Sequence, residues 1–131
     1  MSGQQIELAI NGRFMHQSVT GVQRVARELT REIDHLVSTT HRQFRVRLIC
    51  RSGTDVGDLN LRSIDVQYVP GPRNSFWEQI FLPFAVGRAT LLCLGNTAPF
   101  ALMARRRSVA LVIHDVSYRT FRNAYRLSYR I

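Results

Sequence analysis

Residues 6–37 (IELAINGRFMHQSVTGVQRVARELTREIDHLV) constrain the fold more than any other stretch of this sequence. Ile6, Leu8 and Ile10 alternate with less apolar positions and predict a strand, which Asn11-Gly12 ends. After a loop over residues 12–19, Thr20 is a suitable N-cap for an amphipathic helix. A strand that leads into a helix in this way is the unit from which α/β sheets are built.

The predicted helix has one apolar face, on which residues recur at helical spacing: Val22, Val25, Ala26, Leu29, Ile33 and Leu36. Gly21 lies in its first turn, where free backbone N–H groups and the helix dipole favour an anion, most often a phosphate. Arg24 would add positive charge. The alternative is an ordinary helix start that tolerates a glycine. The sequence has neither the GxGxxG fingerprint nor the GxxxxGK[ST] loop of P-loop NTPases.

Further strands and helices alternate along the rest of the chain. Strands are expected at 44–51 (with one wet face or near a sheet edge), 64–69, 90–94 and 109–113 (in a central position), and helices at 75–87, interrupted or kinked at Pro83, and at 98–105. This order predicts one α/β domain over residues 1–131, with a Rossmann-like, doubly wound, mainly parallel sheet. Ligands of such sheets bind beyond the carboxyl ends of the strands, here residues 12–24, 70–75, 95–98 and 114–118.

Polar residues at these strand ends are candidates for chemistry. His114 could exchange a proton with a substrate hydroxyl, and Asp115 could orient it, or the pair could simply cap a strand. Asn96 and Thr97, in the Gly95-Asn96-Thr97 turn, could bind a ligand or only form the turn.

Other singled-out residues have structural explanations. Trp77 is expected at a helix–sheet contact, and Glu78 is explained by the helix dipole alone. His16, His35 and His41 are interpreted as surface residues, although His16 lies in the loop of interest.

Composition narrows the possible partners. The formal charge is +9, and all 18 basic residues are arginine, so nucleotides and anionic surfaces are attractive partners, unless the dispersed charge is only a solvated surface. Cys50 and Cys93 lie in apolar runs and are expected to be buried free thiols, and no metal site is expected. Because no signal peptide or membrane-spanning run is visible, a cytoplasmic protein is the default.

The last residues combine an aromatic stripe with a basic one. Tyr118, Phe121, Tyr125 and Tyr129 recur at helical spacing beside Arg119, Arg122, Arg126 and Arg130. This helix could lie on an anionic membrane, at the inner face in a peripheral protein, or pack on the sheet or on a further domain. Because its pattern is unfinished at Ile131, the chain is expected to be the front part of a longer protein or a trimmed piece.

Several segments, taken together and in order, resemble the N-terminal domain of a GT-B fold glycosyltransferase of family 4 (group 1). They are NGRF…TGVQRVARELTREID, WEQIFLP, GNTAP and VIHDVSYRTF, and they run through nearly the whole chain. The resemblance implies one of two Rossmann-like domains that face each other across a cleft. The N-terminal domain of such an enzyme mainly binds the acceptor.

The resemblance also implies a reaction and roles. A retaining enzyme would transfer a sugar, often mannose, from a nucleotide-sugar to a saccharide or lipid-linked acceptor in surface polysaccharide synthesis, with no metal and no cofactor. His114 would be catalytic and lie beside the transferred sugar; the donor diphosphate would face Thr20, Gly21, Val22 and Arg24; sugar and acceptor would be bound by Asn11, Arg13, Asn96, Thr97 and Asp115.

The sequence departs from the family by lacking the C-terminal domain, with its E-x7-E segment, so this chain alone is not expected to transfer sugar efficiently. The alternative function is a non-catalytic basic α/β module that binds an anionic membrane or a protein partner. Nucleic-acid binding is disfavoured because no RNP, KH or helix-turn-helix signature is present. A homodimer through the face meant for the other domain remains an alternative to a monomer.

Overall fold

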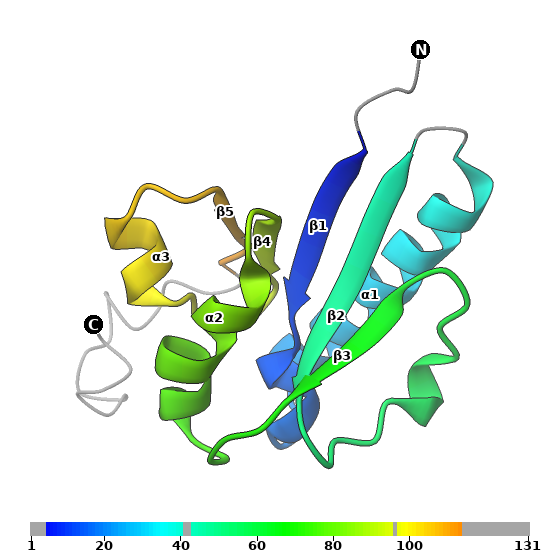
Figure 1. Cartoon of the computed structure of the whole chain (residues 1–131). Helices are drawn as coiled ribbons and strands as arrows, with labels where there is room; N and C mark the ends of the chain where they lie inside the picture. Colours follow the sequence, from blue (N-terminus) through cyan, green and yellow to red (C-terminus); the bar gives the residue numbers. More distant parts are fainter. Residues whose placement is uncertain (1–4, 41–42, 96, 114–131) are drawn as a thin grey trace.

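The computed structural model describes residues 5–40, 43–95 and 97–113, which form an α/β fold around a five-stranded, all-parallel sheet (Figure 1). The strand order is β3-β2-β1-β4-β5. The strands are β1 (Ile6–Asn11), β2 (Phe44–Arg51), β3 (Asp65–Val69), β4 (Thr90–Cys93) and β5 (Val109–Leu111). The predicted α/β class and parallel sheet are confirmed, and the arrangement is consistent with a Rossmann-like fold.

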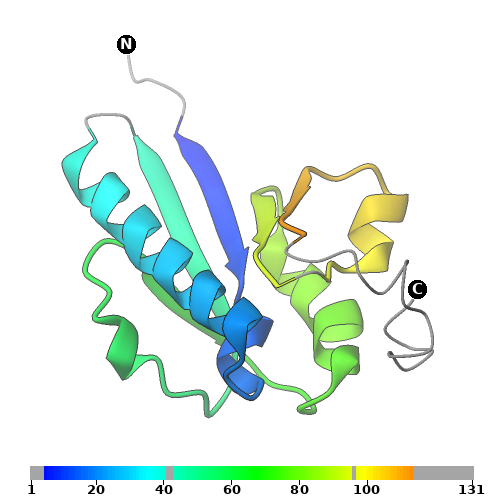
Figure 2. The ribbon, with the colours of Figure 1, turned by 180° about the vertical axis from the view of Figure 1, so that it is seen from behind.

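Helices cover both faces of this sheet. They are α1 (Gly21–Thr39), α2 (Leu82–Val86) and α3 (Phe100–Ala104), with 3₁₀-helices at Gly12–His16 and Gly57–Leu59 and a π-helical turn at Trp77–Phe81. Helix α1 lies on one face, which Figure 2 turns to the viewer, and α2 and α3 lie on the other. The loop predicted over 12–19 therefore contains a 3₁₀-helix.

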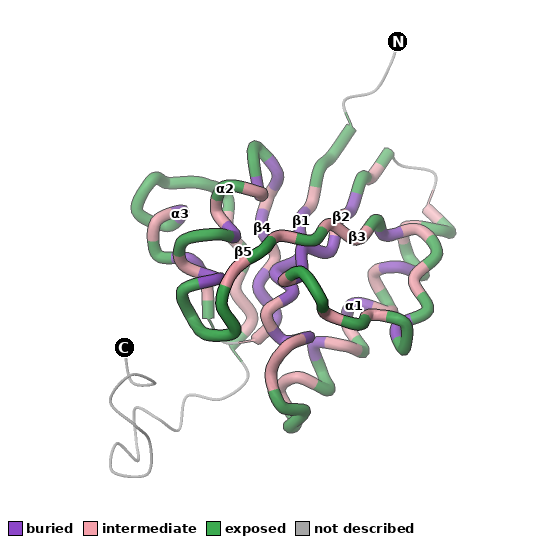
Figure 3. The backbone as a smooth tube through the Cα atoms, turned by 60° about the horizontal axis from the view of Figure 1, so that its bottom comes forward, coloured by how far each residue is buried: buried purple, intermediate pink, exposed green. Residues whose placement is uncertain are grey.

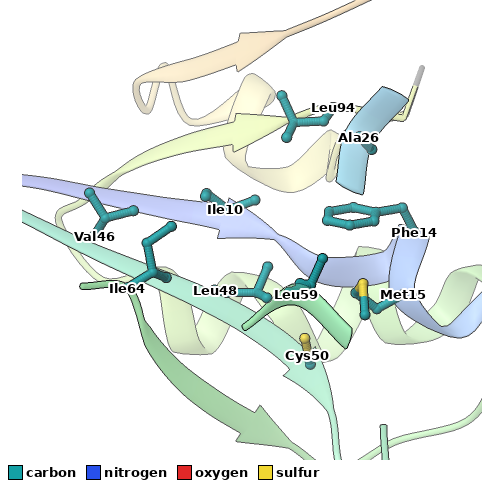
Figure 4. Packing of buried hydrophobic residues seen from close by; sticks show 10 residues of the cluster. All are labelled: Ile10, Phe14, Met15, Ala26, Val46, Leu48, Cys50, Leu59, Ile64 and Leu94. Atoms are coloured by element: carbon teal, nitrogen blue, oxygen red, sulfur yellow. The ribbon is translucent and has the colours of Figure 1, made fainter. Parts of the chain in front are cut away.

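Strand β1 is the centre of the sheet, and alternate residues of it enter two cores. Ile10, paired with Leu48 of β2 and Leu92 of β4, faces the core under α1, where Phe14 lies near Ala26 (Figure 4). The neighbouring Ala9 faces the core under α2 and α3, which surrounds the fully buried Trp77. Figure 3 shows the buried residues gathered between the helices. The predicted place of Trp77 at a helix–sheet contact is confirmed.

The face that α1 buries differs in part from the predicted apolar face. Val25 and Leu36 are exposed, whereas Thr30 and Asp34 are buried. The Thr30 hydroxyl donates to the Ala26 carbonyl (2.8 Å), and the Asp34 carboxylate accepts backbone N–H groups of residues 62–64 at 2.8–3.2 Å. Burial alone would raise the pKa of Asp34, but these N–H donors hold it below its ordinary value. Hydrogen bonds thus allow two polar side chains under α1.

The helix predicted over 75–87, interrupted or kinked at Pro83, is not interrupted there. Residues 75–86 are helical, and the Leu82 N–H donates to the Trp77 carbonyl, five residues back, instead of four. A proline ring clashes with the carbonyl four residues before it, and a π-turn is one way for a helix to absorb that conflict.

The arginines of β2 do not all face water. The guanidinium of Arg47 is half-buried under α2 and donates to the carbonyls of Ala85 and Val86, both at 2.9 Å. Positive charge at the carboxyl end of a helix satisfies its last carbonyls and is favoured by its dipole. The α2 end is therefore fixed to the strand next to the sheet edge.

Strand β5 was predicted to be central, and this prediction is wrong for the described sheet. It has three residues and pairs only with β4, at the edge. An apolar run shows that both faces are covered but not that both edges are paired. The free thiols of Cys50 and Cys93 are both buried, as predicted.

Two glycines give a test of this packing. A Cβ at Gly12 would lie 2.3 Å from the Ile49 carbonyl oxygen, whereas at Gly21 it would meet no described atom within 4 Å. We expect Gly12→Ala to lower the free energy of unfolding by about 3 kcal/mol, and Gly21→Ala to leave it unchanged or raise it by about 0.5 kcal/mol. Urea denaturation measures both, and equal losses would contradict the packing at the end of β1.

Candidate functional site

Polar side chains from four segments meet where the carboxyl ends of β1 and β4 lie side by side. Asn11 is the last residue of β1, and Arg13 follows it in the 3₁₀-helix. Glu78 comes from the π-turn, and Thr97 lies just beyond β4. Strands β2 and β3 follow β1 on one side and β4 and β5 lie on the other, so this is the switch point of the sheet.

The Glu78 carboxylate is the hub of this cluster. It is 1% exposed, and its Oε2 accepts hydrogen bonds from Asn11 Nδ2 (2.8 Å) and Thr97 Oγ1 (2.9 Å). Its Oε1 accepts a bond from Arg13 Nη1 (3.3 Å), which also donates to Thr97 Oγ1 (3.2 Å). A buried carboxylate is tolerated when it is paired and hydrogen-bonded in this way.

A hollow opens above the hub. It is lined by side chains from both halves of the sheet: Asn11, Arg13, Phe14, Gln17, Glu78, Gly95 and Thr97. Amide, guanidinium, hydroxyl and carboxylate groups surround it, with one aromatic ring. Such a set can hydrogen-bond the hydroxyl groups of a polyol or the oxygens of an anion.

Local structure explains why these side chains converge. The Asn11 Oδ1 accepts the Arg13 N–H (3.1 Å), which starts the 3₁₀-helix and turns Arg13 back over the strand end. Gln79 next to Glu78 is bound on both sides: its Nε2 donates to the Ala98 carbonyl (3.0 Å), and its Oε1 accepts the Phe100 N–H (2.7 Å). This clamp holds the segment that carries Thr97 against the π-turn.

Cys93 lies under the cluster but is not a nucleophile. Asn11 Nδ2 also contacts its Sγ at 3.6 Å. Burial raises the pKa of the Cys93 thiol to about 12. The hydrogen bond from Asn11 lowers this pKa in part, and the negative charge of Glu78 raises it further. The thiol therefore stays protonated and serves packing.

His16 was interpreted as a surface residue, but the structure shows it half-buried, with both ring nitrogens buried. Its ring packs edge-on against Trp77, with centroids 5.2 Å apart, and neither buried ring nitrogen has a hydrogen-bond partner among the described residues. Burial, and then the charges of Arg13, Arg51 and Arg73, lower the pKa of His16 to about 4. The imidazole is therefore neutral near pH 7.

The segment predicted to face a diphosphate lies beside the hollow without lining it. Thr20 and Gln23 form a capping box at the start of α1, in which the Thr20 N–H donates to Gln23 Oε1 (3.1 Å). Gln23 Nε2 donates in turn to Gln17, which lines the hollow (3.2 Å). Thr20, Gly21 and Arg24 are exposed at this helix start and Val22 is half-buried. Their donor-binding role stays a prediction.

The structure brings together three of the predicted sugar-binding residues, Asn11, Arg13 and Thr97, whose role in binding stays a prediction. Asn96, His114 and Asp115 lie outside the described residues. Sequence reasoning missed Glu78, because the helix dipole already explained an acid in a first turn. The one signal was an acid directly after Trp77, in a helix whose other residues are mostly apolar.

Comparisons with known proteins identify no relative of this chain. No protein-family model, no curated protein and no solved structure matches this chain significantly. Across residues 5–40, 43–95 and 97–113, no group of three His, Cys, Asp or Glu side chains could hold a metal ion. No helix in the same ranges has the length and apolarity to cross a bilayer.

Removal of the hub should be costly. We expect Glu78→Ala to lower the free energy of unfolding by about 3–5 kcal/mol, because it removes the acceptor that the buried Asn11 amide shares with Arg13 and Thr97, and Glu78→Gln by about 1–3 kcal/mol. Guanidinium denaturation measures both. The control is Glu28→Gln, because Glu28 is exposed and pairs only with Arg31 among the described residues; it should change stability by less than about 0.5 kcal/mol. Equal effects at positions 78 and 28 would contradict the hub.

His16 predicts a pH dependence of stability. The unfolded chain binds a proton near pH 6.5 but the folded one only near pH 4, so the free energy of unfolding should fall as the pH falls from 6.5 to about 4. The depressed pKa of Asp34 lies below this window. We expect His16→Phe to flatten the slope in denaturation series at each pH. His35→Phe, at an exposed position of α1, should leave it unchanged. An unaltered slope in His16→Phe would contradict the buried neutral ring.

Proposed function

We propose that this chain is the acceptor-side, Rossmann-like domain of a retaining glycosyltransferase with the GT-B fold. One observation carries the proposal: three segments that carry the sequence resemblance, NGR, WEQ and GNT, contribute residues to one cluster. Asn11 and Thr97 are separated from Glu78 by 67 and 19 residues in the sequence, yet both donate hydrogen bonds to its carboxylate. A shared sheet edge brings such segments near one another, but it does not require them to share one buried carboxylate.

The chemistry of the cluster supports a sugar or sugar phosphate as ligand. Arg13 and Thr97 are the accessible donors, and both now share the Glu78 carboxylate. A ligand hydroxyl or phosphate oxygen could accept some of the hydrogen bonds that Arg13 and Thr97 now donate to Glu78. The remaining bonds to Glu78 would keep both donors oriented toward the ligand. The hollow also lies at the switch point, where open parallel sheets bind ligands.

In the proposed reaction, the anomeric carbon of a nucleotide-sugar loses its bond to the diphosphate and gains a bond to an acceptor hydroxyl oxygen. The nucleoside diphosphate leaves with the electron pair, and the hydroxyl proton passes to it. Thr20, Gly21, Val22 and Arg24 would face the diphosphate at the start of α1, where helix N–H groups favour anions. His114 would assist beside the transferred sugar. A second domain would hold most of the donor.

The test uses the product of the gene that encodes this sequence, incubated with nucleotide-sugars, saccharide or lipid-linked acceptors and EDTA. We expect release of nucleoside diphosphate and a product with retained anomeric configuration. Arg13→Gln should lower kcat/KM about tenfold or more, His114→Ala by a larger factor, and Arg45→Gln, on the far end of β2, not at all. Full turnover by His114→Ala would sink the catalytic assignment, and no transfer with any donor would sink the proposal.

The alternative is a basic α/β module without catalysis that binds an anionic membrane. The observation that favours it is an exposed apolar surface on α2 and α3 with arginines beside it. Membrane binding and sugar transfer do not exclude each other. Transfer activity therefore decides between an enzyme and a module, and vesicle binding alone does not.

A further inference from the structure

An apolar surface lies on the exposed side of the helical segment 75–86, which includes α2, and of α3. Its members are large hydrophobic residues that are about half exposed or more: Phe76, Ile80, Phe84, Phe100 and Met103, here called the α2–α3 face. Phe84 is 87% exposed and Phe100 75%. Single exposed hydrophobic residues are common in proteins, but a contiguous group marks a binding surface.

The five residues belong to one surface because α2 and α3 are fastened together. Phe76, Ile80 and Phe84 recur every four residues along one helical segment. The clamp from Gln79 to Ala98 and Phe100 brings the start of α3 beside the middle of that segment. Figures 1 and 2 show α2 and α3 side by side from opposite directions.

Arginines border this face at one end. Arg88, Arg105, Arg106 and Arg107 are all exposed, and they are called the basic rim below. Arg107 Nη2 donates to the Gly87 carbonyl (2.6 Å), which places the turn after α3 beside the turn after α2. The four guanidinium groups therefore gather at the same end of the face.

Within residues 66–95 and 97–113, which the structure describes, no exposed acidic side chain balances this charge. Between residues 66 and 113 the sequence contains five arginines and one acid, Glu78, which is buried. Seven of the other eight acids precede residue 66. The molecule is thus divided into a mixed-charge half and a half that is basic and apolar on its surface.

We propose that the α2–α3 face and its basic rim bind an anionic lipid bilayer, with the aromatic rings among the acyl chains and the guanidinium groups on lipid phosphates. Aromatic residues that protrude from helices can enter the interfacial region without a complementary pocket. Arginine forks bind phosphate oxygens bidentately. A protein partner that matches this charge would have to present acids and an apolar hollow together; a bilayer of anionic lipids presents both properties everywhere.

The first experiment measures cosedimentation of the full chain with lipid vesicles. One set is pure phosphatidylcholine, and the other contains about 30 mol% phosphatidylglycerol to resemble an anionic leaflet. We expect binding only to the anionic vesicles, and weaker binding as salt rises. Phe84→Ser/Phe100→Ser and Arg88→Gln/Arg105→Gln should each lower the partition coefficient about tenfold or more. Arg106, with φ of 56°, and the hydrogen-bonded Arg107 are left intact so that the α3 turn keeps its shape.

Matched controls use the other half of the molecule. Val25→Ser/Leu36→Ser removes two exposed apolar residues of α1, and Arg45→Gln/Arg62→Gln removes the same charge from exposed positions. Both should bind as the parent does. If control and face variants bind equally well, the proposal is overturned, and either diffuse charge or residues 118–131 carry the binding. Absence of binding to anionic vesicles overturns it as well.

A fluorescence measurement locates the contact directly. Phe84→Trp should show a blue-shifted emission on anionic vesicles and quenching by brominated acyl chains, whereas Tyr68→Trp, at an exposed position of the edge strand β3, should show neither. Light scattering gives the oligomeric state of the parent and of Phe84→Ser/Phe100→Ser. A dimer that the double variant dissociates, together with no vesicle binding, would assign the face to a second copy of the chain and overturn the proposal.

Discussion

The buried carboxylate of Glu78 is the interaction on which the rest of the site depends. It binds Asn11 at the end of β1 and Thr97 beyond β4, the two strands between which the strand order reverses. An uncompensated charge in this position would be unfavourable by several kcal/mol, so its donors must be held in place. The π-turn that admits Pro83 and the Gln79 clamp supply that positioning.

The helical segment 75–86 has a side that is buried against the sheet and a side that is exposed. Toward the sheet, Trp77 fills the core and Glu78 enters the polar cluster, while Phe76, Ile80 and Phe84 remain outside. Because Gln79 ties α3 to this helix, the hollow and the exposed apolar face share one rigid support. A ligand at the hollow and a bilayer at the outer face could then be engaged by opposite sides of one element.

Much of the fold could be predicted from the sequence because its signals are local. Ile6, Leu8 and Ile10 alternate as a strand does, and Thr20 precedes the helix as N-cap residues do. The site could be predicted only in part. Thr97 follows a strand, and Asn11 and Arg13 lie in a segment that carries the family resemblance, so these three residues were expected at the site. Glu78 was not, because it acquires its role from partners 67 and 19 residues away. The edge position of β5 and the burial of His16 likewise depend on neighbours that no local pattern records.

A double-mutant cycle between Glu78 and Thr97 tests most directly whether the segments meet at this carboxylate. The unfolding free energies of Glu78→Ala, Thr97→Val and the double variant are compared with that of the parent chain. The account predicts a coupling energy of about 1 kcal/mol or more, since a hydrogen bond to a charged group is lost only once. Additive effects, within about 0.5 kcal/mol, would contradict it.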